Sequence, residues 1–165
     1  TLIVPMVESG EQAEMLVRSM RYPPNGIRGV GGAGARATRF SKDAEYLATA
    51  DDEMCLVVQV ENEAGLNALD DLLLVEGVDA VFIGPSDLSA NMGHIGNPGA
   101  PEVVAAVDDA LDRIAASDKA SGIMALDPAA AKAYLDRGVD FVAVSIDART
   151  LALSLRALAA EMRDR

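Results

Sequence analysis

Short apolar segments alternate with amphipathic stretches along the whole chain, and this pattern predicts the order of its elements. The apolar segments cover residues 2–7, 55–60, 80–83, 122–125 and 141–146. Between them, apolar residues recur at helical spacing, as they do from Ala13 to Met20. The sequence therefore predicts five β/α units, and such alternation indicates a parallel sheet with crossover helices.

Capping signals place the ends of the expected helices. Ser9 is followed by Gln12 in the capping-box position. Asp127-Pro128 is expected to start a helix that Gly138 ends. The remaining expected helices run from Ser41 to about residue 50, over 63–74 after Asn62, from Pro101 to about 116, and from Asp147 to about 162, with a loop over 91–100.

Two architectures fit five β/α units in a single domain over residues 1–165. One is a doubly wound five-stranded sheet, which the pattern alone slightly favours because it would be complete at this length. The other is part of a TIM-type (β/α) barrel, since a whole barrel typically needs about 250 residues.

Composition narrows the possible partners and the compartment. Half of the residues are hydrophobic, yet no apolar run reaches membrane-spanning length and the amino terminus lacks a basic-then-apolar signal pattern. The net charge of −12 argues against nucleic acid or an anionic membrane as partner. Cys55 is the only cysteine, so no internal disulfide forms, and we expect a cytoplasmic location.

Polar residues follow two of the expected strands at their carboxyl ends, where parallel α/β folds bind ligands. Gln59 and Glu61 are two residues apart and would share one face of a strand, and Asp87 would reach the same mouth from the next strand. Such oxygen ligands suit a hard divalent ion. In the alternative interpretation, Glu61 begins the next helix and Asp87 caps one after a Gly-Pro turn.

Other candidate groups carry weaker signals. Gly29 to Gly34 matches the G-x-G-x-x-G pattern of dinucleotide sites, but it follows a Pro-Pro-Asn-Gly break, so a surface or mouth loop is expected. Three arginines near this loop could bind a carboxylate or remain solvated: Arg28, Arg36 and Arg39. His94 is expected in a solvent-facing loop. No lysine follows a strand, which disfavours Schiff-base chemistry.

Several blocks, in the same order, resemble the HpcH/HpaI aldolase family of metal-dependent class II pyruvate aldolases. The blocks are Val4-Pro5-Met6-Val7, residues 21–29 (RYPPNGIRG), Gln59-Val60-Glu61, residues 77–89 (GVDAVFIGPSDLS) and Gly96-Asn97-Pro98. The likeness covers essentially the whole chain. It implies a TIM-type barrel, present here as its C-terminal five β/α units, and assembly as a homo-oligomer, usually a hexamer that exchanges the last helix.

The resemblance also implies roles for individual residues. Glu61 and Asp87 would be ligands of a divalent metal, Mg²⁺, Mn²⁺ or Co²⁺. Gln59 would contact the pyruvate moiety, and the backbone N–H groups of Ser86 and Asp87 would bind its carboxylate. The implied reaction is reversible aldol cleavage of a 2-keto-4-hydroxy acid, as in aromatic or sugar acid catabolism, to pyruvate and an aldehyde.

One part of the family pattern lies outside this sequence. The family's histidine base and charge-stabilising arginine belong to β/α units that would precede Thr1, which itself already lies in an apolar strand pattern. Two alternatives to the aldolase therefore stay open. One is a catalytically silent assembly or binding module, and the other is oxaloacetate decarboxylation at the same site.

Overall fold

A computed structural model describes residues 1–163 and contains one parallel sheet of five strands. The strands are β1 (Leu2–Val4), β2 (Leu56–Val60), β3 (Ala80–Ile83), β4 (Ala120–Met124) and β5 (Phe141–Ala143). Each strand pairs in parallel with the next one along the chain, in the order β1-β2-β3-β4-β5. A doubly wound sheet reverses its strand order, so this sequential order confirms the barrel arc and excludes the doubly wound alternative.

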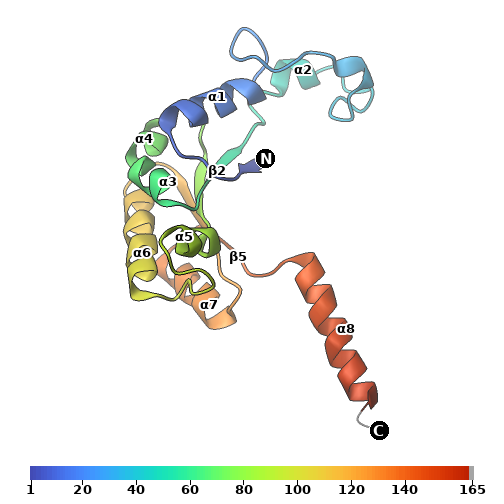
Figure 1. Ribbon diagram of the computed structural model, residues 1–165. Coiled ribbons are helices and arrows are strands. Elements are labelled where there is room, and N and C mark those ends of the chain that lie inside the picture. The colour runs from blue at the N-terminus through green and yellow to red at the C-terminus, as the bar shows by residue number, and fades with distance from the viewer. Residues whose placement is uncertain (164–165) are drawn as a thin grey trace.

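Helices join the strands and line one side of the sheet (Figure 1). They are α1 (Gly10–Met20), α2 (Tyr46–Thr49), α3 (Glu63–Asn67), α4 (Leu69–Leu74), α5 (Pro85–Asn91), α6 (Pro101–Ala115), α7 (Pro128–Arg137) and α8 (Asp147–Arg163), with a 3₁₀ turn η1 (Gly32–Gly34). In Figure 1, α1, α4 and α6 follow one another along the sheet, whereas α8 extends away from it. The sheet is therefore an arc with its helices outside.

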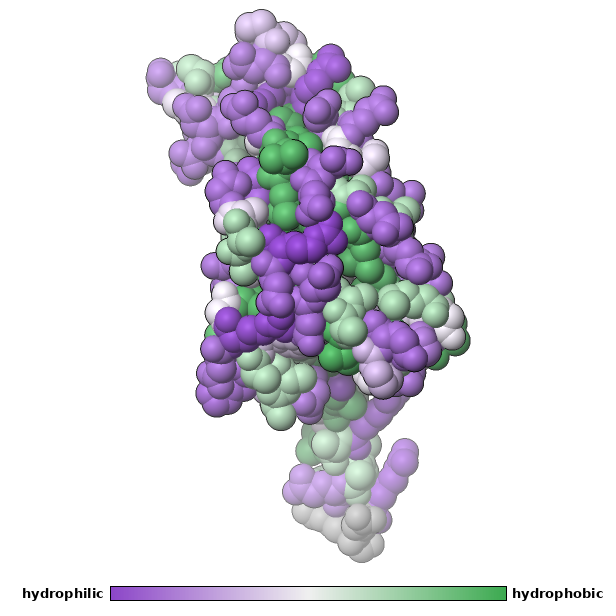
Figure 2. Space-filling view, turned by 90° about the vertical axis from the view of Figure 1, so that its left-hand side faces the viewer, coloured by the Kyte–Doolittle hydropathy of each residue, from purple (hydrophilic) through white to green (hydrophobic). Residues whose placement is uncertain are grey.

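Alternate residues of each strand face opposite sides of this arc. On β2, Leu56, Val58 and Val60 are buried in the main core between the sheet and the helices. Val57 faces the opposite side, where it packs in a small cluster with Ala80, Phe82 and neighbouring side chains. Figure 2 shows that the outer surface of the helical layer is mostly hydrophilic, with scattered hydrophobic side chains.

The predicted caps are largely confirmed. Ser9 Oγ accepts from Gln12 N at 3.1 Å, and Asn62 Oδ1 accepts from Gly65 N at 2.8 Å. Asp127 caps α7, which ends at Gly138 in the left-handed conformation with φ 101°. Local chemistry thus fixes the starts of α1, α3 and α7 and the end of α7.

Two predicted boundaries are wrong for backbone reasons. The first strand ends at Val4 rather than residue 7, since Pro5 has no N–H and Met6 is left-handed with φ 54°. Ser41 does not cap a helix, because it is itself left-handed with φ 67°, and the short helix starts only at Tyr46.

Three further expectations differ in extent. The helix expected over 63–74 is two helices, α3 and α4, that meet at Ala68. The last strand stops at Ala143 instead of residue 146. The segment after Gly84 forms a helix, α5, as expected, but Gly84 rather than Asp87 is its N-cap, and Asp87 lies in its first turn.

A short motif recurs at the amino ends of β3 and β5. Gly77-Val78-Asp79 precedes β3 and Gly138-Val139-Asp140 precedes β5, each with a left-handed glycine and a buried valine. Asp79 Oδ2 accepts from Leu56 N at 2.7 Å, and Asp140 Oδ2 accepts from Ser121 N at 2.7 Å. Each aspartate thereby ties its own strand to the start of the preceding one.

We predict that Asp140→Asn lowers stability near neutral pH and less so in acid. The Ser121 backbone N–H, and then its hydroxyl, hold the pKa of Asp140 below its usual value. A depressed pKa contributes stability above the unfolded-state value, near 3.9, and that contribution is lost as pH falls through the folded-state pKa. Asp140→Asn should lower the free energy of unfolding at pH 7 by about 1 kcal/mol.

Urea denaturation at pH 7 and pH 3 measures this difference. Asp52→Asn is the matched control, since no side-chain hydrogen bond or ion pair of Asp52 occurs among residues 1–163. An equal loss for Asp140→Asn at both pH values would contradict the assignment.

Candidate metal and substrate site

A buried carboxylate lies at the carboxyl end of β2. Glu61, only 3% exposed, immediately follows the strand. Its Oε1 accepts from the backbone N–H of Met6 at 2.9 Å, and its Oε2 accepts from Gln59 Nε2 at 2.5 Å. The structure thus brings Gln59 and Glu61 together on one face, as their spacing predicts. Charge-assisted bonds of this kind offset part of the cost of burying the carboxylate.

Gly84 allows this carboxylate to pack closely against the end of β3. A Cβ atom at position 84 would lie 2.6 Å from Glu61 Oε2, 2.9 Å from Glu61 Cβ and 3.0 Å from Gln59 Nε2. Any larger residue would therefore displace the Glu61 side chain. The end of β3 is shaped around Glu61.

Ser86 and Asp87 lie in the first turn of α5, directly after Gly84 and Pro85. Both side chains are exposed. With Gln59, they line an open cavity of about 540 Å³ on the concave side of the sheet. The rest of its lining is mainly apolar: Ile3, Phe82, Met124, Leu126, Phe141, Ala143 and Ile146. Three of the four predicted site residues therefore line one cavity, and the buried Glu61 lies directly behind two of its lining residues, Gln59 and Gly84.

The donor set fits a hard divalent cation. Glu61 and Asp87 supply carboxylate oxygens, and Gly84 allows Glu61 to lie against the end of the neighbouring strand. Residues 1–163 contain no group of three or more His, Cys, Asp or Glu side chains placed to hold a metal. Mg²⁺ is commonly held by only one or two carboxylates plus substrate and water, so two acidic ligands suffice for this class of ion.

The arginine and histidine candidates lie outside this cavity. The Arg28 guanidinium stacks 4.5 Å from the Tyr22 ring centroid and donates to the Tyr46 hydroxyl at 3.0 Å. His94 Nε2 lies 3.8 Å from Glu102 Oε2 in the turn after α5. Neither residue lines the cavity that contains Gln59 and Asp87.

The glycine-rich loop does not form a dinucleotide fingerprint. It holds only the short turn η1 and then three successive left-handed residues, Arg39, Phe40 and Ser41. The loop lines a separate cavity of about 320 Å³. It follows no strand and begins no long helix, as the Pro-Pro-Asn-Gly break predicts.

Two contributors to the site were missed by sequence reasoning. Met6 contributes through its backbone N–H, and the type of its side chain does not reveal such a contact. Gly84 was noted only as part of a Gly-Pro turn. Gly84 follows an expected strand, which was the one available signal, whereas Met6 lies inside the segment 2–7 that was expected to be a strand.

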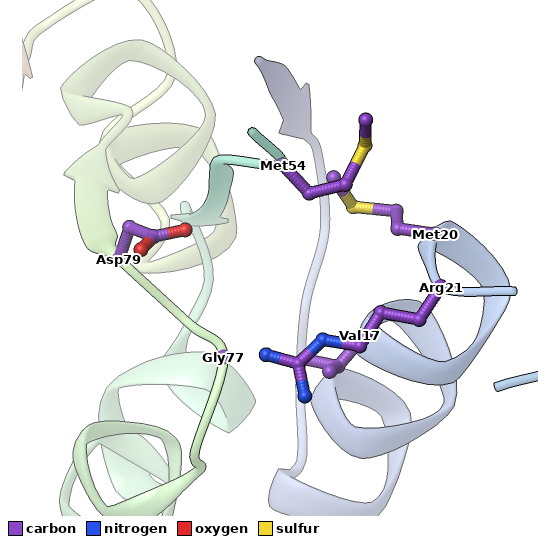
Figure 3. A pocket seen from close by; sticks show the side chains of 6 residues that line it. All are labelled: Val17, Met20, Arg21, Met54, Gly77 and Asp79. Carbon is purple, nitrogen blue, oxygen red and sulfur yellow. The ribbon is translucent and has the colours of Figure 1, made fainter. Parts of the chain in front are cut away.

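A second, smaller cavity of about 30 Å³ lies at the opposite, amino end of β2 and β3. Figure 3 shows Arg21 reaching from α1 toward Gly77, with Met54 and Asp79 nearby. This volume suits one water molecule rather than a substrate. Its position at the amino ends of the strands indicates a role in stability.

Comparison with known proteins identifies the family of this chain. Residues 1–153 match the family model described as HpcH/HpaI aldolase/citrate lyase. The chain belongs to this family. The HpcH/HpaI resemblance drawn from the sequence blocks is thereby confirmed.

Named relatives within the HpcH/HpaI family are aldolases. A hydroxypyruvate/pyruvate aldolase of Pseudomonas aeruginosa is 58% identical over 99% of this chain and 61% of the relative's length. A 4-hydroxy-2-oxo-heptane-1,7-dioate aldolase of Klebsiella pneumoniae is 52% identical over 97% of this chain and 60% of the relative. The chain thus spans about three fifths of the length of the curated relatives it matches.

A solved structure supports the same fold. The crystal structure of an HpcH/HpaI aldolase/citrate lyase family protein from Burkholderia cenocepacia superimposes with a TM-score of 0.91 at 36% identity, covering 98% of this chain and 64% of that one. Within residues 1–163, no helix is both long and apolar enough to cross a membrane.

We predict that Gly84→Ala disrupts the site. The added methyl group would overlap Glu61, which should destabilise the protein by about 1–3 kcal/mol, the usual cost of overpacking. It should also weaken Mn²⁺ binding by about 10–100-fold, because the carboxylate must move. Calorimetric titration with Mn²⁺ and thermal unfolding measure the two effects.

Gly29→Ala is the matched control, since a Cβ at position 29 meets nothing within 4 Å. It should leave both quantities unchanged. Wild-type Mn²⁺ affinity in Gly84→Ala would show that the space beside Glu61 Oε2 is not part of the site.

Proposed function

We propose that this chain carries the metal and pyruvate part of a lyase. The reaction is reversible aldol cleavage of a 2-keto-4-hydroxy acid to pyruvate and an aldehyde. The observation that carries the proposal is the buried, doubly hydrogen-bonded Glu61 beside a cavity lined by Gln59 and Asp87. Membership of a family whose named relatives are aldolases supports it.

Glu61 and Asp87 would hold a divalent ion, with Mg²⁺, Mn²⁺ or Co²⁺ favoured over Zn²⁺ because both ligands are oxygens. When bound, such an ion acts as a Lewis acid that stabilises negative charge on an oxygen of the substrate. The Glu61 carboxylate is oriented beforehand by Met6 and Gln59, so little reorganisation is needed on binding.

Substrate contacts would come from the same mouth. Gln59 uses one amide hydrogen for Glu61 and retains its second hydrogen and its carbonyl oxygen for the pyruvate moiety. The first turn of α5 leaves the N–H groups of Ser86 and Asp87 without intrahelical acceptors, which suits a carboxylate. The apolar side of the cavity, which includes Phe82 and Met124, would face the rest of the substrate.

Proton transfer needs a group that this cavity does not supply from residues 1–163. None of its lining residues is a histidine, lysine or arginine. By the family resemblance, the base and a charge-stabilising arginine come from β/α units that precede these five. Because the lining has no such group, a catalytically silent binding module is the second candidate function. Oxaloacetate decarboxylation at the same site stays a third.

We also propose a homo-oligomer, with the hexamer expected from the family resemblance. Within residues 147–163, no side chain of α8 is buried, and its exposed leucines are Leu151, Leu153, Leu155 and Leu158. A cytoplasmic location stays a prediction.

The aldolase proposal predicts metal-dependent pyruvate release that depends on the upstream units. Residues 1–165 alone should cleave 4-hydroxy-2-oxo acids at no more than about a thousandth of the rate of a version extended by the family's preceding units, since positioned acid–base catalysis contributes about 10²–10⁴-fold. Coupled detection of pyruvate with Mn²⁺, and with a chelator, measures this.

Within the extended version, Glu61→Gln and Asp87→Asn should each abolish Mn²⁺ binding and activity, whereas Asp52→Asn should change neither. Metal binding without pyruvate release in the extended version would favour the silent module. Release of pyruvate from oxaloacetate only would favour the decarboxylase.

Assembly can be tested on the same preparations. We predict an oligomer by light scattering, and replacing Leu151 and Leu155 by glutamate should shift it toward smaller species. A monodisperse monomer for the unmodified protein would refute the proposal.

A further inference from the structure

The backbone at Met6 adopts a conformation that residues with side chains rarely take. Its φ is 54°, in the left-handed region, and it follows Pro5 directly after β1. Within residues 1–163, the other non-glycine residues with positive φ form one run, Arg39 to Ser41, in the glycine-rich loop. Met6 is therefore the one such residue next to the proposed metal site in the described part of the chain.

The Met6 side chain does not explain this conformation. It is 45% exposed and contributes nothing to the main core. Its sulfur has one polar neighbour, the Asn62 amide nitrogen at 3.6 Å. The function of residue 6 must therefore be sought in its backbone.

The left-handed turn directs a backbone donor at a buried charge. Met6 N–H donates to Glu61 Oε1 at 2.9 Å, across 55 positions of sequence. If residue 6 were extended, it would continue β1, and its N–H would take part in the hydrogen bonding between strands. The unusual φ therefore accompanies the contact that fixes one oxygen of the proposed metal ligand.

Neighbouring contacts hold the turn in place from both sides. Val7 is buried, and its N–H donates to the carbonyl oxygen of Gln59 at 3.1 Å. Gln12 Nε2 donates to the Met6 carbonyl at 3.4 Å, while its Oε1 accepts from Glu8 N at 2.9 Å. Uncommon backbone conformations persist where the surroundings determine them in this way, and they are concentrated at functional sites.

We propose that residue 6 is a positioning residue of the metal site, acting through its left-handed backbone. Its N–H fixes the orientation of the Glu61 carboxylate, which together with Asp87 would hold the cation. The expected effect on metal binding rests on the proposed function, but the hydrogen bond from Met6 N–H to Glu61 exists without any cation. Outer contacts of this kind typically change metal affinity by about 10–100-fold when lost.

Three substitutions in the full chain separate backbone from side chain. Met6→Gly adopts positive φ freely and should bind Mn²⁺ within about twofold of wild type. Met6→Leu retains a side chain of similar size that is not branched at Cβ, and it should do the same. Met6→Val is β-branched, strongly disfavours the left-handed region, and should weaken Mn²⁺ binding by about 10–100-fold.

A measurement without metal tests the contact independently. In metal-free protein, the residue 6 amide should be protected from hydrogen exchange, and Glu61→Gln should move its NMR signal strongly. The same amide should keep its protection in Met6→Gly and lose it in Met6→Val. This readout stays informative even if Met6→Val is too unstable for titration, since wild type and Met6→Gly suffice.

The outcomes are distinct. Equal Mn²⁺ affinity in Met6→Val and wild type, equal loss in Met6→Gly and Met6→Val, or a freely exchanging residue 6 amide in wild type would each overturn the positioning role. Absence of Mn²⁺ binding in wild type, with a protected amide that responds to Glu61→Gln, would refute the proposed function and leave the contact established.

Discussion

The need to satisfy one buried carboxylate organises the carboxyl end of this sheet. Glu61 is almost fully enclosed, and an ionised group in such a place is tolerated only with hydrogen-bond donors on its oxygens. The donors come from two strands of the arc, since Met6 follows β1 and Gln59 lies on β2. Gly84, after β3, supplies the space. The ends of β1, β2 and β3 must therefore stay in register with one another for the Glu61 side chain to keep these contacts.

The sequence predicted those parts of the fold that depend on local chemistry. Alternation along residues 55–60 placed Gln59 and Glu61 on one face because side chains alternate strictly on a strand. Asn62 and Asp127 marked helix starts because their side chains bond nearby amides. Strand order could not be read in this way. A doubly wound sheet and a barrel arc have the same alternation, and only the resemblance to a family favoured the barrel.

The parts that escaped prediction are set by contacts between distant segments or by the backbone. Met6 contributes an N–H that every residue except proline has, so its type carries no signal. The close approach of Gly84 to Glu61 joins positions on different strands, and spacing within one segment cannot show it. The position of the mouth could be predicted from Gln59, Glu61 and Asp87. The groups that shape it, Met6 N–H and Gly84, could not.

The recurrence of Gly-Val-Asp before β3 and β5 gives the arc a period of two β/α units. Each aspartate acts within its own pair of strands, Asp79 on β2 and Asp140 on β4. Each pair of strands is therefore a module, and the aspartate hydrogen bond between its two strands does not depend on whether a barrel is closed around it. Loss or gain of one pair would therefore leave the aspartate-to-amide hydrogen bond inside the other pair unchanged.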